Sequence, residues 1–220
     1  MPAWESTCWT VIRAAAAGSP AERAELARRY LGVVRAYLAA RWRDSHLRAD
    51  LDDVVQEVFV ECFRQGGVLE AAVDGRVPSF RAFLYGVVRN VARRFESRAA
   101  PAASPLPEIP DDEPSLSRLF ERAWAQAIMT EAAQLQQQRA SERGPEAVRR
   151  VELLRLRFEE NLPIRTIAVR WGVPAAGLHH AYALARQEFK AILLEVVAFH
   201  HPGSPAEVEQ EAASLLKALS

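Results

Sequence analysis

The sequence predicts an all-α protein that consists of two small helical domains. Half of the 220 residues are hydrophobic, which is enough to build one core or two small ones. These hydrophobic residues recur at spacings of three and four, the period of an amphipathic helix, and none of the segments considered below has the alternation of a β-strand. Glycine and proline gather between the periodic segments, where they predict the ends of helices.

The first block of predicted helices extends to residue 98. A helix is expected from Trp9 to Ala16, followed by a break at residues 18–20 in which Ser19 can cap the next helix. A polar turn after that second helix reaches Asp50, which can cap a third. The expected buried face of the second helix consists of Leu26, Tyr30, Val33, Val34, Tyr37, Leu38 and Trp42.

The helix expected from Leu51 to Phe63 has an acidic outer face. Asp53, Gln56 and Glu57 lie together with Val60 on the side opposite the apolar stripe. Solvation alone can explain such a face on an isolated helix. The segment contains no basic residue, however, and this asymmetry points to a basic protein partner. The apolar stripe consists of Leu51, Val54, Val55, Val58, Phe59 and Cys62.

A loop from Gln65 to Ser79 leads to a basic helix that begins near Phe80. Its apolar stripe is Phe80, Phe83, Leu84, Val87, Val88, Val91 and Phe95, and its outer row is Arg81, Tyr85, Arg89 and Arg93, flanked by Asn90 and Arg94. Guanidinium groups at four-residue spacing repel one another, a cost that is explained if phosphates lie alongside. An exposed tyrosine can stack on an unpaired base. The competing interpretation is a basic surface helix with Tyr85 partly buried.

Residues 99–115 predict an extended linker. They are rich in proline and acidic residues and contain no basic residue, and the acidic side chains repel one another. The two blocks are therefore expected to be tethered rather than packed into a single core. The predicted domains are residues 1–98, a linker at 99–115, a second domain at 116–200 and a short helical tail at 201–220.

The second block predicts further helices, two of which form a helix-turn-helix. Helices are expected from Leu116 to Glu142 and from Pro145 or Glu146 to Glu160, and a tail helix from Ser204 to Leu219. Between them, Gly172 ends one amphipathic helix and a second begins after Pro174, as in a DNA-binding helix-turn-helix. An ordinary helical hairpin has the same pattern. The two apolar stripes are Ile164, Ile167, Ala168 and Trp171, then Leu178, Ala181, Tyr182, Ala185 and Phe189.

The outer face of the second helix of this pair has few long hydrogen-bond donors. It holds Ala175, Ala176, His179, His180, Ala183, Arg186 and Lys190. Base contacts would depend on close approach at the alanines and on donation by the two histidines. Arg165, Arg170, Arg186 and Lys190 suit contacts to phosphate. The histidine pair lacks a carboxylate or cysteine spaced to complete a metal site.

Composition narrows the possible functions. The net charge is zero, which is unusual for a protein that binds DNA unaided. Cys8 and Cys62 lack the spacing of a zinc site and are expected to be packing residues, with an exposed thiol as the alternative for Cys8. No segment is apolar enough to span a bilayer and no export signal is recognisable, so a cytoplasmic protein without membrane insertion is expected. No catalytic motif is found, so neither enzymatic activity nor a metal or cofactor is expected.

Taken together, these segments resemble a bacterial RNA polymerase sigma factor of the extracytoplasmic function (ECF) type, in the sigma-70 family. The resemblance extends roughly from Trp9 to His200. It departs from the family at residues 174–177, where serine or threonine and basic residues are common, and at Phe83, where tryptophan is common. The segments that carry it are DLDDVVQEVFVECF, FRAFLYGVVRNVARRF, FERAWAQAI, the proline-rich linker and the helix-turn-helix that ends in ARQEFKAILLEVV.

The resemblance implies an initiation factor whose partners are core RNA polymerase and promoter DNA, with an anti-sigma factor as a further candidate. Docking on the clamp coiled coil of the largest polymerase subunit would fall to Asp53, Gln56 and Glu57. Capture of unpaired bases at the minus 10 element would fall to Arg81, Phe83, Tyr85, Arg89, Asn90, Arg93 and Arg94. The minus 35 duplex would contact Arg165, Arg170, Ala175, Ala176, His179, His180, Arg186 and Lys190.

Two other functions compete with this one. A stand-alone helix-turn-helix regulator would bind duplex DNA tightly without polymerase. A helical adaptor that binds only proteins would have no affinity for DNA. The sigma interpretation requires that Tyr85 and its neighbouring arginines are not sealed in the interior of a single globule.

Overall fold

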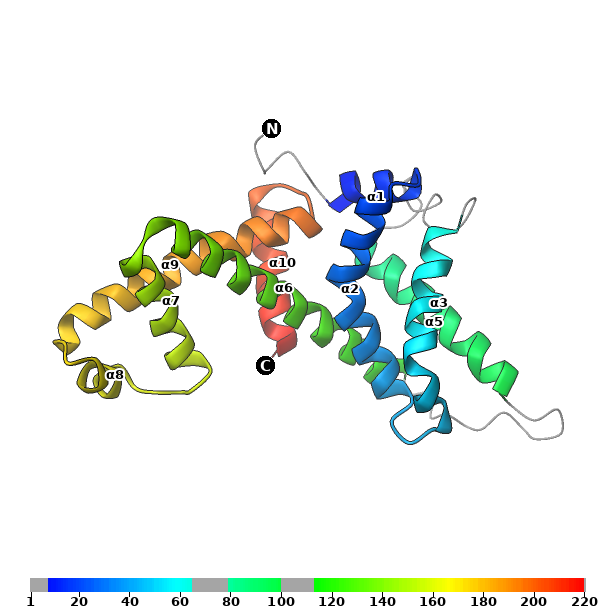
Figure 1. The fold of residues 1–220 in the computed structure, drawn as a ribbon, viewed down its shortest axis with the longest axis horizontal. Helices are drawn as coiled ribbons and strands as arrows, with labels where there is room; N and C mark the ends of the chain where they lie inside the picture. The colour runs from blue at the N-terminus through cyan, green and yellow to red at the C-terminus, as the bar shows by residue number, and fades with distance from the viewer. Residues whose placement is uncertain (1–7, 65–78, 100–112, 220) are drawn as a thin grey trace. The chain divides into compact units, whose positions relative to one another are not determined.

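The computed structural model describes residues 8–64, 79–99 and 113–219 and is all-helical over these ranges, as the sequence predicts (Figure 1). None of the helices described there is long and apolar enough to cross a membrane. In chain order the elements are α1 (Cys8–Ala16), α2 (Pro20–Arg41), the 3-10 helix η2 (His46–Asp50), α3 (Leu51–Phe63), α5 (Phe80–Ala99), α6 (Glu113–Arg143), α7 (Pro145–Phe158), α8 (Ile164–Trp171), α9 (Ala175–His200) and α10 (Pro205–Leu219).

The contacts divide the chain into two compact units. Unit 1 comprises the described residues up to Ala127 together with those from Ala198 onward, and unit 2 is Ile128–Val197. In unit 1, α2 packs against α1, α3 and α5, and α3 packs against α5 (Figure 1). Tyr37, Leu38 and Trp42 of the α2 region are fully buried in this core. The apolar stripes predicted for α2 and α5 therefore face one another, although Phe95 is only half-buried.

An aromatic cluster places the start of α6 and the end of α9 in unit 1. The ring of Trp124 stacks on that of Tyr30 with 5.1 Å between centroids, and Phe120 lies 5.1 Å from Tyr85. The Tyr30 hydroxyl and Nδ1 of the buried His200 are hydrogen-bonded at 2.8 Å. The boundary between the two compact units therefore lies within α6, because these large side chains of α6 are buried with the first block.

The expected linker and the expected loop fall largely outside the described residues. Residues 100–112 of the linker and 65–78 of the loop are not described. Of the remaining linker positions, Ala99 ends α5 and residues 113–115 belong to the first turn of α6. The tail predicted after His200 is helical as α10, where Ser204 and Glu207 cap each other's backbone N–H groups at 3.4 and 2.7 Å.

Two predicted helix caps differ in detail from the structure. Ser19 occupies the N-cap position of α2, but its hydroxyl bonds to the Glu22 carboxylate rather than to a backbone N–H. The prediction that Asp50 caps α3 is wrong. The 3-10 helix η2 runs directly into α3, so Asp50 is the last residue of η2, with φ −94° and ψ 11°, and its side chain makes no cap. Ser45 caps η2 instead, accepting from the Leu47 N–H at 3.2 Å.

Both cysteines are buried, so the packing interpretation is confirmed and the exposed alternative for Cys8 is wrong. The Cys8 thiol donates to the backbone carbonyl of His200 at 3.3 Å. Burial raises the pKa of each thiol to about 12, which keeps both protonated and unreactive at neutral pH. Within the described residues, no group of histidine, cysteine and acidic side chains could hold a metal ion.

Unit 2 contains the predicted helix-turn-helix. Its core consists of Leu153, Leu156, Ile164, Ile167, Ala168 and Leu178. Helix α8 ends at Trp171 and α9 begins at Ala175, which leaves residues 172–174 as the turn. Gly172 is left-handed, with φ 62° and ψ 36°, and the Val173 N–H donates to the Ala168 carbonyl at 3.1 Å. These bonds satisfy the last carbonyl groups of α8, as the sequence pattern predicts.

Substitution of the turn glycine tests this geometry. We expect Gly172→Ala to destabilise unit 2 by about 1–2 kcal/mol, since a Cβ disfavours the left-handed region. A matched control is Gly177→Ala in the first turn of α9, where the backbone is helical and an added Cβ meets nothing within 4 Å. The control should be neutral or stabilising by up to about 0.5 kcal/mol. Urea denaturation followed by circular dichroism measures both, and equal effects of the two substitutions would contradict the prediction.

Candidate nucleic-acid interface

The outer face of α3 is acidic and open to solvent. Asp53 and Gln56 are exposed and Glu57 is half-buried. Val60, on the same face, is 58% exposed although it is a large apolar residue. This face therefore offers a partner both negative charge and an apolar contact.

The predicted outer row of α5 divides into covered and open positions. Asn90 and Arg93 are exposed, whereas Arg81, Tyr85, Arg89 and Arg94 are half-buried. Phe83 is only 7% exposed and packs against Phe80, with 5.7 Å between ring centroids, so it cannot contact a base in this conformation. The stripe periodicity places Phe83 on the core side, and only the family resemblance implies a base contact.

Arg81 and Tyr85 are covered by residues far away in the sequence. Nη1 of Arg81 lies 2.8 Å from a Glu211 carboxylate oxygen of α10 and 3.2 Å from one of Glu121 of α6. The Tyr85 ring packs between Phe120, at 5.1 Å, and Tyr37, at 5.7 Å. Sequence periodicity could not find these contacts, because it reports only which face of a helix is apolar and not which segment covers it.

Arg94 contributes to the connection between α5 and α3. Its guanidinium donates to the Glu61 carboxylate at 2.9 Å, and Arg64 contacts the same oxygen at 2.8 Å. The Arg94 hydrogen bond lowers the pKa of Glu61 from its ordinary value and outweighs the opposing effect of desolvation. Within the row, the side chains of Asn90 and Arg93 are the exposed ones.

A buried ion pair fixes the opposite side of α5 and was missed in the sequence. Nε of Arg41 donates to Oε1 of Glu96 at 2.6 Å and Nη2 donates to Oε2 at 3.0 Å. The indole Nε1 of Trp42 donates to the same Oε1 at 2.8 Å. A signal was present, because Glu96 continues the buried stripe of Val88 and Ala92 at four-residue spacing. The network joins the ends of α2 and α5. It therefore holds α5, the helix that carries the outer row, in place against α2.

In unit 2, the predicted DNA-contacting face is open to solvent. On the inner side of α9, Leu178 and Ala185 are buried, and Ala175 at the start of the helix is half-buried. Arg170 forms an ion pair with Glu160 at 3.4 Å, and the Arg186 guanidinium lies 5.8 Å from the centre of the Tyr182 ring. The exposed residues of the predicted face are Arg165, Arg170, Ala176, His179, His180, Arg186 and Lys190.

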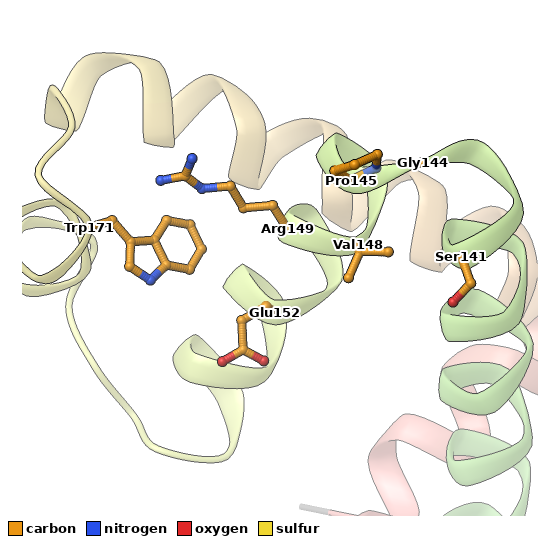
Figure 2. A pocket seen from close by; sticks show the side chains of 7 residues that line it. All are labelled: Ser141, Gly144, Pro145, Val148, Arg149, Glu152 and Trp171. Atoms are coloured by element: carbon orange, nitrogen blue, oxygen red, sulfur yellow. The ribbon is translucent and has the colours of Figure 1, made fainter.

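Unit 2 also contains a shallow hollow of about 720 Å³ that is separate from this face (Figure 2). Figure 2 shows the Arg149 side chain extended toward the Trp171 ring, and the guanidinium lies 4.7 Å from the ring centre. None of the predicted DNA-contacting residues lines this hollow. Its lining residues are Ser141, Gly144, Pro145, Val148, Arg149, Glu152 and Trp171.

Comparison with known proteins does not place the chain in a family. No protein-family model matches the sequence, and no curated protein is significantly similar to it.

Proposed function

We propose that this protein is a sigma factor of the ECF type, which binds core RNA polymerase and directs it to promoters. The observation that carries the proposal is the exposed acidic face of α3 in a chain that also contains a helix-turn-helix. A DNA-binding helix pair alone needs no acidic protein-binding face. An initiation factor needs both, since it must join a polymerase to a promoter.

The proposal assigns a separate task to each surface. Asp53, Gln56 and Glu57 would bind the clamp coiled coil of the largest polymerase subunit, and the exposed Val60 would add an apolar contact. The outer row of α5 would hold the unpaired strand of the minus 10 element. Stacking and ionic contacts of this kind favour strand separation without ATP. The protein would act in the cytoplasm, where its polymerase is.

The helix-turn-helix would bind the minus 35 element as a duplex. The first turns of α9 would enter the major groove with His179 and His180 as donors, while Arg165 and Arg170 of α8 would contact phosphates. Exposed small residues such as Ala176 would allow the helix to approach the base edges closely. The zero net charge fits this arrangement, because polymerase would supply much of the affinity for phosphate.

The second candidate is a stand-alone helix-turn-helix regulator, which the open face of α9 also favours. The two functions differ in what they require for DNA binding. A regulator binds its duplex site tightly by itself, whereas a sigma factor needs polymerase for specific binding and produces a transcript.

Runoff transcription tests the proposal directly. We expect the purified full chain, added to bacterial core RNA polymerase and genomic promoter fragments, to produce discrete transcripts that core polymerase alone does not produce. Gel-shift measurements on the same fragments provide the comparison without polymerase. Tight specific duplex binding without polymerase and no transcripts would favour the regulator. No DNA binding with or without polymerase would leave only the protein-binding adaptor.

A further inference from the structure

The tail helix α10 is a well-formed element of unit 1 whose acidic side chain reaches the predicted DNA-contacting row. Val208, Ala212 and Leu215 are buried along its inner side, and the Ser204 and Glu207 pair caps its start. Glu211 precedes Ala212 at the edge of this buried side, and its side chain is 15% exposed. Packing of α10 therefore brings the carboxylate of Glu211 to Arg81 on α5.

Arg81 is held by two carboxylates rather than one. Besides Glu211, Glu121 of α6 lies 3.2 Å from the same guanidinium nitrogen. Burial raises the pKa of Glu121 and the nearby Glu211 raises it further, whereas Arg81 lowers it. The two acids thus repel one another, and Arg81 is the cation that keeps them together. If Arg81 formed an ion pair with a DNA phosphate instead, Glu121 and Glu211 would repel each other without this cation between them. Binding of DNA at Arg81 and packing of α10 would therefore oppose each other.

The neighbouring base-stacking position is covered by the same part of the chain. Phe120 lies one residue before Glu121 on α6 and packs on the Tyr85 ring at 5.1 Å. The carboxylates of Glu121 and Glu211 therefore contact Arg81, the group proposed to bind phosphate. One helical turn further along α5, the ring of Phe120 contacts Tyr85, the group proposed to stack on a base. A nucleic acid strand presents the same two chemistries, an anion and a flat ring.

We propose that α10 and the start of α6 form an autoinhibitory cover that competes with single-stranded DNA for Arg81 and Tyr85. The inference rests on the proposed function, because it takes the outer row of α5 as the surface for the unpaired strand. The cover lowers the affinity of the free chain for single strands. The strand must displace Glu211 from Arg81 to bind.

The test compares two variants. One removes a negative charge from the cover, and the other removes a negative charge from a nearby position of the same helix. Glu211→Gln keeps the size of the side chain but removes the ionic partner of Arg81. Glu209→Gln is the matched control, since Glu209 is an exposed residue of the same helix and gives the same change in net charge. The probe is a fluorescent oligothymidylate strand, titrated by anisotropy with the full chain at fixed low salt.

We expect Glu211→Gln to bind the strand about threefold to tenfold more tightly than the wild type, the gain expected from release of one charge-assisted contact. Glu209→Gln should remain within about twofold of the wild type. The double variant Arg81→Ala/Glu211→Gln should lose the gain, because the gain acts through Arg81. Equal affinities of Glu211→Gln and Glu209→Gln, a gain that persists without Arg81, or no binding by any variant would overturn the proposal.

Runoff transcription by the same variants separates this inference from the proposed function. Tighter strand binding by Glu211→Gln without transcripts from any variant would support the cover and reject the sigma assignment. If the wild type produced transcripts and the two glutamine variants bound the strand equally well, the sigma assignment would be supported and the cover rejected. Circular dichroism compares the total helix content of each variant with that of the wild type.

Discussion

Replacement of Glu96 by leucine is expected to destabilise unit 1 by about 3–5 kcal/mol, the cost of leaving a buried charge without its partner. The side chain of Arg41 is 5% exposed and that of Glu96 is 10% exposed. Burial disfavours the charged form of Arg41, but the hydrogen bonds of Glu96 raise its pKa above the ordinary value, so the guanidinium stays charged. In Glu96→Leu this cation loses its carboxylate partner, although it still donates to the Tyr37 hydroxyl at 3.3 Å, and the indole N–H of Trp42 loses its acceptor.

Two further variants separate the buried charge from other effects. Arg41→Met/Glu96→Leu removes both charges, and we expect it to be more stable than Glu96→Leu alone, because no unpaired ion remains. Glu61→Leu breaks the Arg94 contact, in which the guanidinium side chain is 41% exposed, and should cost no more than about 1 kcal/mol. Urea denaturation followed by circular dichroism gives all three values. A loss of less than 1 kcal/mol in Glu96→Leu would show that the pair does not hold α5 on α2.

The sequence was sufficient to predict the helices and the turn of unit 2, because these depend on neighbours along the chain. The left-handed Gly172 and the stripe at Ile164, Ile167 and Ala168 are local signals, and the structure has them where the pattern places them. Asp50 shows the limit of the same reasoning. Its side chain is suited to a cap, but the preceding residues already form a helical turn, which the polar composition of that segment did not reveal.

The partners of the outer row of α5 could not be predicted in the same way. Arg81 and Glu211 are 130 residues apart in the chain, and nothing in the periodicity of either helix specifies the other. The position of the boundary between the units could not be predicted for a similar reason. Phe120 and Trp124 belong to the apolar stripe of α6, but only the folded chain shows that the stripe packs on Tyr30 and Tyr85 of the first block.

These contacts divide the outer row of α5 into two halves with different chemistry. The first half, with Arg81 and Tyr85, already contacts acidic and aromatic side chains of the same unit. The second half presents exposed Asn90 and Arg93. Under the proposed function, an unpaired strand that contacts Arg81 or Tyr85 would replace these contacts of the first half.

Reversal of the charges of Asp53 and Glu57 is expected to lower the affinity for core RNA polymerase by on the order of 100-fold or more. Each lysine would replace an attraction to a basic surface by repulsion, and close charge pairs across an interface contribute strongly to affinity. Asp53 is exposed and Glu57 half-buried, on the side of α3 opposite Val54, Val55 and Val58, so the fold should tolerate the double variant Asp53→Lys/Glu57→Lys. Surface plasmon resonance with immobilised core polymerase measures the affinity.

The matched control is Glu142→Lys/Glu209→Lys, which changes the net charge equally at two exposed residues of α6 and α10. It should bind core polymerase within about threefold of the wild type, because charges away from the interface act weakly at physiological salt. The α3 variant should lose runoff activity and keep the duplex affinity of the wild type, since unit 2 is unchanged. If both double variants bound polymerase equally well, the acidic face of α3 would not be the polymerase contact, whatever the helix-turn-helix does.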